Sequence, residues 1–191
     1  MSATNAPFGL RPAYHPSGLD RATALADGIL STYSTSILKG QPVKLDTSGV
    51  IQVAAAGDAF LGAFSGVEWT DTTGRRRVSN YWPASTAYQT GSCIAYYYDD
   101  PNIVYEIQAD GSLAQTSVGA ESDLSATTAG STTTGLSAAT LSTTLAGSGN
   151  SAQMRIINLA PYPDNAWGDS YTIVRATIAE YQFAGAAGTA I

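Results

Sequence analysis

The sequence predicts an all-β protein: a small β-barrel or a β-tulip or sandwich-like domain that follows an extended N-terminal arm. From residue 29 onward, short runs of β-branched and aromatic residues alternate with Gly, Pro, Asn and Asp, a pattern typical of strands joined by tight turns. Helical periodicity is almost absent, which disfavours βαβ units. The chain has 191 residues, of which 44% are hydrophobic and 13% are charged, so it is long enough to bury a core of its own.

Residues 1–28 are predicted to form the extended arm, and residues 29–191 the β-rich domain. Pro7, Pro12 and Pro16 disfavour both a helix and the interior of a paired strand. The arm nevertheless carries large apolar side chains of a kind that a solvated tail usually lacks: Phe8, Leu10, Tyr14, Leu19 and Leu25. We therefore expect the arm to dock on its own subunit or on a neighbouring one.

Three turn sequences predict hairpins in the β-rich domain. The first joins residues 43–45 to residues 51–53 through Asp46-Thr47-Ser48-Gly49. The second joins residues 93–98 to residues 103–107 through Asp99-Asp100-Pro101-Asn102, where proline suits the second position of a turn. The third is a two-residue turn at Asp110-Gly111, because both residues tolerate the backbone angles that such turns need.

Further strands are expected over residues 60–69, 155–159 and 171–183. The Ser/Thr-rich segment 125–151 allows two interpretations. Its composition is that of a flexible linker, but threonine favours strands and the leucines offer apolar surface to bury. The second interpretation places a polar strand over residues 136–145 with mobile loops on either side.

The charge balance argues against nucleic acid as a direct partner. Nine Lys and Arg stand against fifteen Asp and Glu, a net charge of −6 at pH 7, whereas binding a polyphosphate depends on cationic contacts. The only dense basic run is Arg75-Arg76-Arg77. We interpret this run as a solvated strand end or a partner for carboxylates rather than as a phosphate clamp.

Few residues of the chain suit catalysis or metal binding. It has one His and one Cys, and no glycine-rich phosphate loop. We expect His15 to be exposed or hydrogen-bonded and Cys93, which opens an apolar strand, to be a buried, unreactive thiol. The sequence thus predicts no catalytic residues, no metal site and no cofactor. The longest uncharged stretch, residues 125–154, is too polar to span a bilayer, and a single cysteine is compatible with folding in the cytoplasm.

Aromatic residues form the remaining candidate surface. Alternation along a strand sends Tyr97 to the opposite face from Tyr96 and Tyr98. We interpret the aromatic residues between positions 81 and 105 as core or subunit interface, with carbohydrate stacking as the alternative. They are Tyr81, Trp82, Tyr88, Tyr96, Tyr97, Tyr98 and Tyr105. The candidate interface residues are Tyr81, Trp82 and Tyr97.

Four stretches, in order along the chain, carry a resemblance: Asn5-Ala6-Pro7-Phe8-Gly9-Leu10-Arg11-Pro12, Leu38-Lys39-Gly40-Gln41-Pro42-Val43-Lys44-Leu45, Phe60-Leu61-Gly62-Ala63-Phe64-Ser65-Gly66-Val67, and Ala160-Pro161-Tyr162-Pro163-Asp164-Asn165 with the strand expected over residues 171–182. They resemble parts of the small decoration or cement proteins that coat the heads of tailed bacteriophages. The chain departs from the family pattern at Pro161 and Tyr162, where a charged residue before the Pro-Asp-Asn turn is more usual.

The resemblance implies a β-rich structural protein of the virion, commonly a homotrimer, made in the bacterial cytoplasm. Such a protein sits on the outer capsid surface, binds the major capsid protein and stabilises the shell by bridging neighbouring capsomers. Removing residues 1–12 is then expected to weaken attachment without disturbing the fold of residues 29–191. The candidate contact residues for the capsid or a neighbouring subunit are Asn5, Pro7, Phe8, Leu10, Arg11, Pro12 and Tyr14.

Three alternatives stay open at this point. The tyrosines and the Ser/Thr-rich loops also suit a glycan- or receptor-binding head of a phage fibre or appendage. Another minor virion subunit is the nearest rival. A hydrolase would need carboxylates that meet only in the folded protein.

Overall fold

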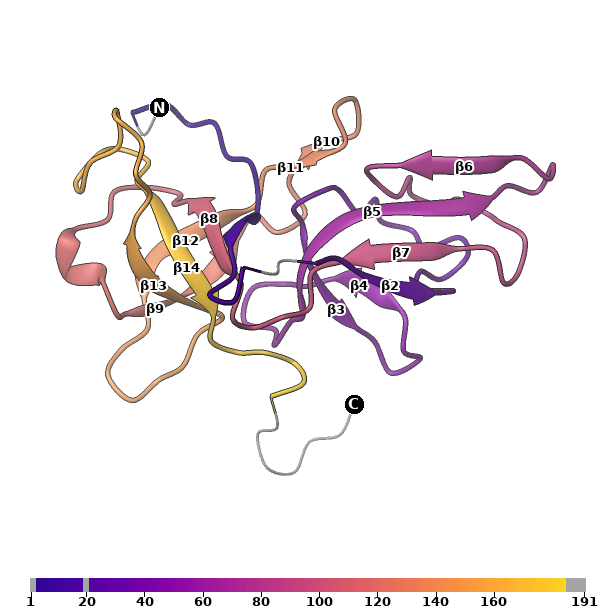
Figure 1. The fold of residues 1–191 in the computed structure, drawn as a ribbon. Coiled ribbons are helices and arrows are strands. Elements are labelled where there is room, and N and C mark those ends of the chain that lie inside the picture. The colour runs from indigo at the N-terminus through magenta and orange to yellow at the C-terminus, as the bar shows by residue number, and fades with distance from the viewer. Residues whose placement is uncertain (1–2, 19–20, 185–191) are drawn as a thin grey trace.

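The computed structural model describes residues 3–18 and 21–184, which form two all-β lobes side by side (Figure 1). Each lobe contains one six-stranded antiparallel sheet, and a two-stranded hairpin lies beside them. The all-β prediction is therefore confirmed, although neither sheet closes into a barrel within the described ranges. The hairpin consists of β10 (Gly130–Ser131) and β11 (Leu136–Ser137). The only helical element among the described residues is one 3₁₀ turn, Gln115–Ser117.

The N-lobe, at the right in Figure 1, contains the sheet of strands from the first half of the chain. Its order is β2-β7-β5-β3-β4, and β6 pairs with the distal part of β5. The strands are β2 (Thr23–Ala26), β3 (Pro42–Leu45), β4 (Ile51–Val53), β5 (Gly62–Thr70), β6 (Arg76–Ser79) and β7 (Ile94–Tyr97).

The C-lobe, at the left in Figure 1, combines strands from the second half of the chain with the first strand of all. Its order is β1-β8-β14-β13-β9-β12. The strands are β1 (Arg11–Tyr14), β8 (Val104–Gln108), β9 (Glu121–Ser125), β12 (Thr140–Leu145), β13 (Met154–Leu159) and β14 (Ile173–Ile178).

The segment expected to be an arm is built into both sheets of its own chain. β1 pairs with β8 in the C-lobe, and β2 pairs with β7 in the N-lobe. Both are end strands, where a residue without an N–H, such as Pro12, is tolerated. The prolines therefore exclude a central strand from this segment but not an edge strand. Leu19, one of the expected apolar anchors, lies outside the described residues.

The predicted hairpin across residues 93–107 is wrong. β7 and β8 follow each other in the chain but belong to different sheets, so the turn between them carries the chain from the N-lobe to the C-lobe. The turn chemistry itself is as expected, since the Asp100 carboxylate accepts hydrogen bonds from the backbone and side chain of Asn102. Asp110-Gly111 likewise begins no new strand, because the chain continues into the 3₁₀ turn.

Other local predictions are confirmed. β3 and β4 form the expected hairpin, with Val43 opposite Val53. The strands expected over residues 60–69, 155–159 and 171–183 correspond to β5, β13 and β14. The Ser/Thr-rich segment is not a linker, since it contributes β12, in which Leu141 is fully buried.

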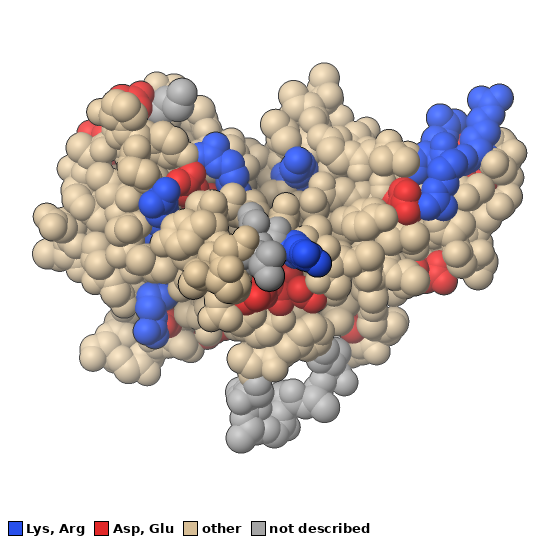
Figure 2. All heavy atoms as spheres, viewed as in Figure 1, with Lys and Arg blue, Asp and Glu red and all other residues tan. Residues whose placement is uncertain are grey.

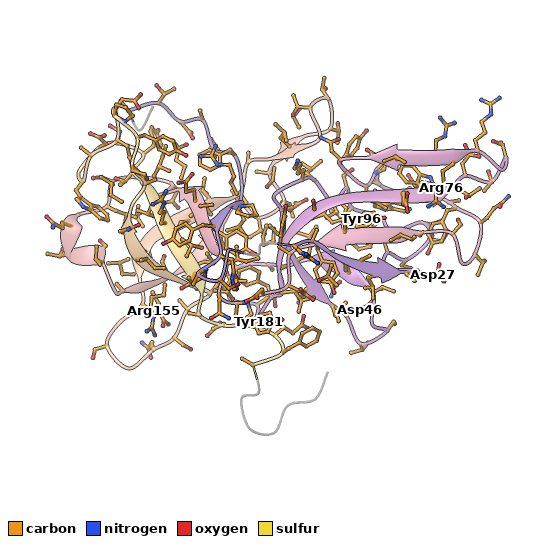
Figure 3. The ribbon with its side chains drawn as sticks, in the orientation of Figure 1. Asp27, Asp46, Arg76, Tyr96, Arg155 and Tyr181 are labelled. Atoms are coloured by element: carbon orange, nitrogen blue, oxygen red, sulfur yellow. The ribbon has the colours of Figure 1, made fainter. Side chains whose placement is uncertain are left out.

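The two lobes share packing at their junction. Phe60 and Ala63 come from N-lobe segments but belong to the buried cluster of the C-lobe. The chain beyond β14 returns to the N-lobe, and Gln182 exchanges hydrogen bonds with the backbone of Leu45. Tyr181 packs against both clusters and donates its hydroxyl to the Asp99 carbonyl; it lies below the junction in Figure 3. These contacts fix the lobes against one another.

Candidate functional site

The segment before β1 runs across the C-lobe and is held by polar contacts to its own chain. The Gln108 side chain accepts a hydrogen bond from the Ala6 N–H at 2.9 Å and donates one to the Thr4 carbonyl at 3.0 Å. Leu10 is buried in the C-lobe cluster. Of the predicted contact residues, Leu10 therefore serves this chain's own core, whereas Asn5 and Tyr14 are exposed and Pro7, Phe8 and Pro12 are partly buried.

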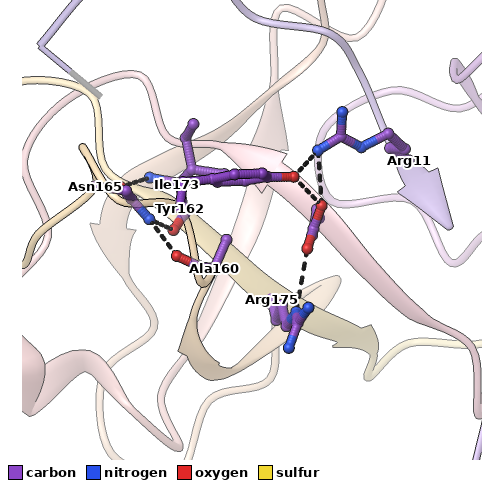
Figure 4. A network of polar contacts seen from close by, with 7 residues as sticks. Arg11, Ala160, Tyr162, Asn165, Ile173 and Arg175 are labelled. Carbon is purple, nitrogen blue, oxygen red and sulfur yellow. Dashed lines mark hydrogen bonds and ion pairs between the residues drawn. The ribbon is translucent and has the colours of Figure 1, made fainter. Parts of the chain in front are cut away.

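A buried carboxylate, Glu106, is the centre of the site (Figure 4). Its side chain is only 8% exposed, and it lies in β8, every residue of which is buried. Arg11 of β1 approaches it at 2.7 Å, and the Nε of Arg175 in β14 at 3.2 Å. The Tyr162 hydroxyl donates to the same carboxylate and accepts from Arg11. One carboxylate thus joins three segments that are far apart in the sequence.

Tyr162 is held in place by the turn that carries it. The Asn165 side-chain amide donates to the carbonyls of Ala160 and Ile173, at 2.8 Å each. Its carbonyl oxygen accepts the Ile173 N–H at 3.0 Å. These three bonds fasten the 160–165 turn to the start of β14, as Figure 4 shows. The uncharged Pro161-Tyr162 pair therefore supplies a hydroxyl to the Glu106 cluster.

The hydrogen bonds to Glu106 together change its pKa more than its burial does. Burial alone raises the pKa of this carboxyl, but hydrogen bonds from Tyr162, Arg11 and Arg175 lower it below its ordinary value. Burial and the adjacent carboxylate raise the pKa of Tyr162. The cluster is therefore an ionised carboxylate with two cations and a neutral phenol.

Aromatic rings extend the cluster toward the surface. The Arg11 guanidinium lies 4.5 Å from the ring centre of Phe8, and that of Arg175 lies 5.4 Å from the ring centre of Tyr14. Both distances are within the range of cation–π attraction. Four of the predicted contact residues, Phe8, Arg11, Pro12 and Tyr14, thus gather around β1, and the first three also line a pocket beside it.

That pocket, which we call the interlobe pocket, has a volume of about 250 Å³. Its lining is mainly apolar, with Arg11 and Lys39 as the charged members. Figure 2 shows the surface hollowed between the C-lobe and the β10–β11 hairpin, with cationic side chains beside the hollow. The residues that line the pocket are Phe8, Leu10, Arg11, Pro12, Lys39, Gly40, Phe64, Tyr98 and Leu136.

The four stretches singled out in the sequence meet near the contact between the N-lobe and the C-lobe. The Leu10 N–H donates to the Gly40 carbonyl, and the Gly40 N–H donates to the Phe64 carbonyl, both at 2.8 Å. Gly9 has φ +74°, and a Cβ on it would lie 2.5 Å from the Gly40 oxygen, so only glycine fits. The fourth stretch joins them through Tyr162 and Arg11. Removing residues 1–12 would therefore take Leu10 and Arg11 out of the folded body, contrary to the expectation of a separable arm.

The aromatic candidates lie elsewhere, and two of them belong to the core, one of the two roles expected for them. Trp82 is fully buried in the N-lobe cluster, edge-on to Trp69 and Tyr88, and Tyr97 is 4% exposed in the same cluster. Tyr97 points into the core from β7, and Trp82 is packed there from the segment between β6 and β7, so both agree with the core interpretation. Tyr81 is partly buried.

The basic run has the role expected for a strand end. Arg76 pairs with Glu68 at 2.7 Å and Arg77 with Asp71 at 2.9 Å, at the tip of the β5–β6 hairpin (Figure 2). The Tyr96 hydroxyl, which lies near Arg76 in Figure 3, also donates a hydrogen bond to Glu68. His15, in turn, lies 3.0 Å from an Asp100 oxygen, and its Nδ1 accepts from the Ser17 N–H. Both findings confirm the structural interpretations.

The cysteine yields a direct test of the fold. Cys93 is buried in the N-lobe cluster, and burial raises the pKa of its thiol to about 11. At pH 8 only about one thiol in a thousand is then ionised, and the thiolate is the reactive form. We expect a disulfide reagent such as 5,5′-dithiobis(2-nitrobenzoate) to label the native protein at least 100-fold more slowly than the urea-unfolded chain. Complete labelling of the native protein within minutes would contradict this placement.

Glu106, Arg175 and Tyr162 are the site residues that sequence reasoning missed. A charged residue in the apolar run 103–107 was the available signal for Glu106, since buried carboxylates are rare without partners. Nothing local points to Arg175 or Tyr162. Arg175 reaches the cluster through the pairing of β14 with β8, and Tyr162 through the turn that Asn165 fastens to β14.

No group of three or more His, Cys, Asp or Glu side chains in the described ranges is arranged to hold a metal ion. No helix in that part of the chain is long and apolar enough to cross a membrane. Comparison of the chain with protein-family models, curated proteins and solved structures found no match.

Proposed function

We propose that this protein is a structural subunit of a tailed-bacteriophage head that binds the outer surface of the capsid. It binds the major capsid protein and stabilises the shell by bridging neighbouring capsomers. The two lobes then represent a variant of the β-tulip or sandwich-like architecture of decoration domains. The protein is made in the host cytoplasm and joins the shell as part of the virion.

One observation carries the proposal: the four stretches that resemble decoration proteins meet at a single junction in space. Their backbones and side chains bond to one another between the lobes. Motifs that are scattered in sequence but joined in the fold are what a shared architecture requires, because each fixes the position of the others. The stretches that carry the resemblance are therefore the ones whose contacts hold the two lobes together.

The charge of the protein supports an external location. A net charge of −6 is unfavourable next to packaged DNA and favourable for solubility outside the shell. A homotrimer multiplies each small interface, because linked contacts raise the effective concentration of the next one. A subunit that binds only the assembled shell stabilises that shell in proportion to its occupancy.

The test is co-sedimentation of the purified protein with phage heads that lack it, using expanded heads and unexpanded precursor heads in parallel. We expect saturable binding to expanded heads only, and a higher temperature of head disruption at saturation. Absence of binding to both kinds of head would overturn the proposal and favour a fibre or appendage protein.

A further inference from the structure

The interlobe pocket has the character of a docking site for a protein segment. Its floor and walls come from both lobes and from the segment before β1, and they are mainly apolar. Leu136 of β11 borders it with its side chain 47% exposed. A large apolar side chain left in solvent beside an apolar pocket is a surface that a partner would bury.

The size of the pocket limits what it can hold. Small-molecule sites usually have volumes of about 300–1,000 Å³, and this pocket has about 250 Å³. One or two large apolar side chains fit such a space, whereas a cofactor-sized ligand does not. The occupant is therefore better matched by side chains from a polypeptide.

The charge at the pocket favours an acidic neighbour for that side chain. Lys39 is exposed and has no acidic partner within the described ranges, whereas Lys44 pairs with Asp58 at 2.7 Å. Arg11, which also lines the pocket, has a side chain that is 49% exposed although it already contacts Glu106. In a protein with a net charge of −6, two cations beside one apolar pocket attract an anionic group there.

The backbone beside the pocket suits an extended occupant. β1 is the end strand of the C-lobe sheet, with β8 as its strand partner, and it lies on the side of the C-lobe that faces the N-lobe (Figure 1). End strands offer backbone groups to an added extended segment. Arg11 and Pro12 of this strand also line the pocket.

We propose that the interlobe pocket binds an extended segment of the capsid partner, in which a large apolar side chain enters the pocket beside an acidic residue that contacts Lys39. This inference rests on the proposed function for the identity of the partner. The pocket chemistry stands independently of it, and the test separates the two.

The first arm of the test uses the purified protein alone. The probe is the acetylated and amidated peptide Glu-Leu-Glu, titrated while amide chemical shifts are followed by NMR, with Glu-Gly-Glu and Lys-Leu-Lys as controls. We expect saturable shifts at Lys39, Gly40 and Leu136 with Glu-Leu-Glu, and at least tenfold weaker binding of both controls. Lys39→Glu should weaken Glu-Leu-Glu binding at least tenfold. Absence of these shifts, or equal binding of the three peptides, overturns the pocket proposal.

The second arm uses expanded heads and two matched pairs of variants. Lys39→Glu and Leu136→Ser alter the pocket, and Arg75→Glu and Leu30→Ser alter exposed residues that do not line it. We expect the first pair to lose at least tenfold in binding to heads and the second pair to bind as the unmodified protein does. Equal binding by all four variants overturns the pocket as the capsid contact and leaves the proposed function intact. If the unmodified protein binds peptide but not heads, the pocket chemistry holds, whereas the proposed function and the capsid as the partner both fail.

Discussion

Gly62→Ala is expected to destabilise the protein by more than about 4 kcal/mol, an exceptional size that few mechanisms reach, a steric conflict in the core among them. A Cβ at this position would lie 2.0 Å from the carbonyl oxygen of Tyr98 and 2.8 Å from the hydroxyl of Tyr105. The first neighbour is backbone in the segment that carries the chain from one lobe to the other, so it cannot turn away as a side chain could. For a chain of this length we expect the Tm to fall by more than about 8 °C, measured by thermal and urea unfolding.

Gly57→Ala is the matched control for this effect. Gly57 has φ +79°, but no atom lies within 4 Å of the position a Cβ would take. Alanine there bears only the cost of a left-handed backbone, about 1–2 kcal/mol. If the two variants differ by less than about 1 kcal/mol, the close approach of Gly62 to Tyr98 is not as described.

Glu106→Gln is expected to lower the free energy of unfolding by about 2–3 kcal/mol at pH 7. Removing one partner of a buried ion pair costs about 3–5 kcal/mol. Here the side chains of Arg11 and Arg175 are 49% and 24% exposed, so water solvates them once the carboxylate charge is gone, which places the loss below that range. The variant should keep its β-sheet circular dichroism and unfold at a lower urea concentration.

The pH dependence follows from the direction of the pKa shift. The folded-state pKa of Glu106 lies below the ordinary value of 4.5, so its contribution to stability is fully present above that pH and is lost as the pH falls through the folded pKa. The gap in Tm between the unmodified protein and Glu106→Gln should therefore narrow below pH 4.5. A gap that stays constant down to pH 3 would show that the variant acts through packing and not through charge.

Glu121→Gln is the control for a carboxylate with a single arginine partner. Glu121 pairs with Arg155, whose side chain is 60% exposed, at the surface of the C-lobe. The Glu121 carboxylate is itself only 13% exposed and also accepts the Ala152 N–H at 3.0 Å, but it has one exposed arginine partner where Glu106 has two cations. Glu121→Gln should therefore lower the free energy of unfolding by about 1 kcal/mol, less than Glu106→Gln does. If Glu121→Gln lowers the free energy of unfolding as much as Glu106→Gln does, the additional contacts of Glu106 contribute nothing to stability.

The sequence predicted those parts of the fold that depend on neighbouring residues. The turn at Asp46-Thr47-Ser48-Gly49 determines both the reversal of the chain and the partner strand, so the β3–β4 hairpin could be predicted. The turn at Asp99-Asp100-Pro101-Asn102 has equally clear chemistry, yet it joins two sheets. Turn residues specify a change of direction, and only long-range packing decides which sheet receives the next strand.

The same limit applies to the candidate site. The apolar side chains of the first segment correctly indicated that it docks, and Leu10 shows how. The place where it docks could not be predicted from the sequence, because Arg11 contacts Glu106 only through the pairing of β1 with β8. For Trp82 and Tyr97 the sequence left core and interface open, because composition identifies an aromatic residue but not whether its ring is buried.

The placement of β1 has a consequence for the order in which the molecule forms on the ribosome. Arg11 and its partner Glu106 are 95 positions apart, and at a synthesis rate of about 5–20 residues per second the gap takes roughly 5–20 s to fill. The N-lobe strands pair with one another during that time, whereas β1 has no strand partner until β8 has been synthesised. Its apolar side chains are then free to pair with the C-lobe of another nascent copy. Correct assembly of each subunit therefore depends on β1 meeting the β8 of its own chain before that of a neighbour.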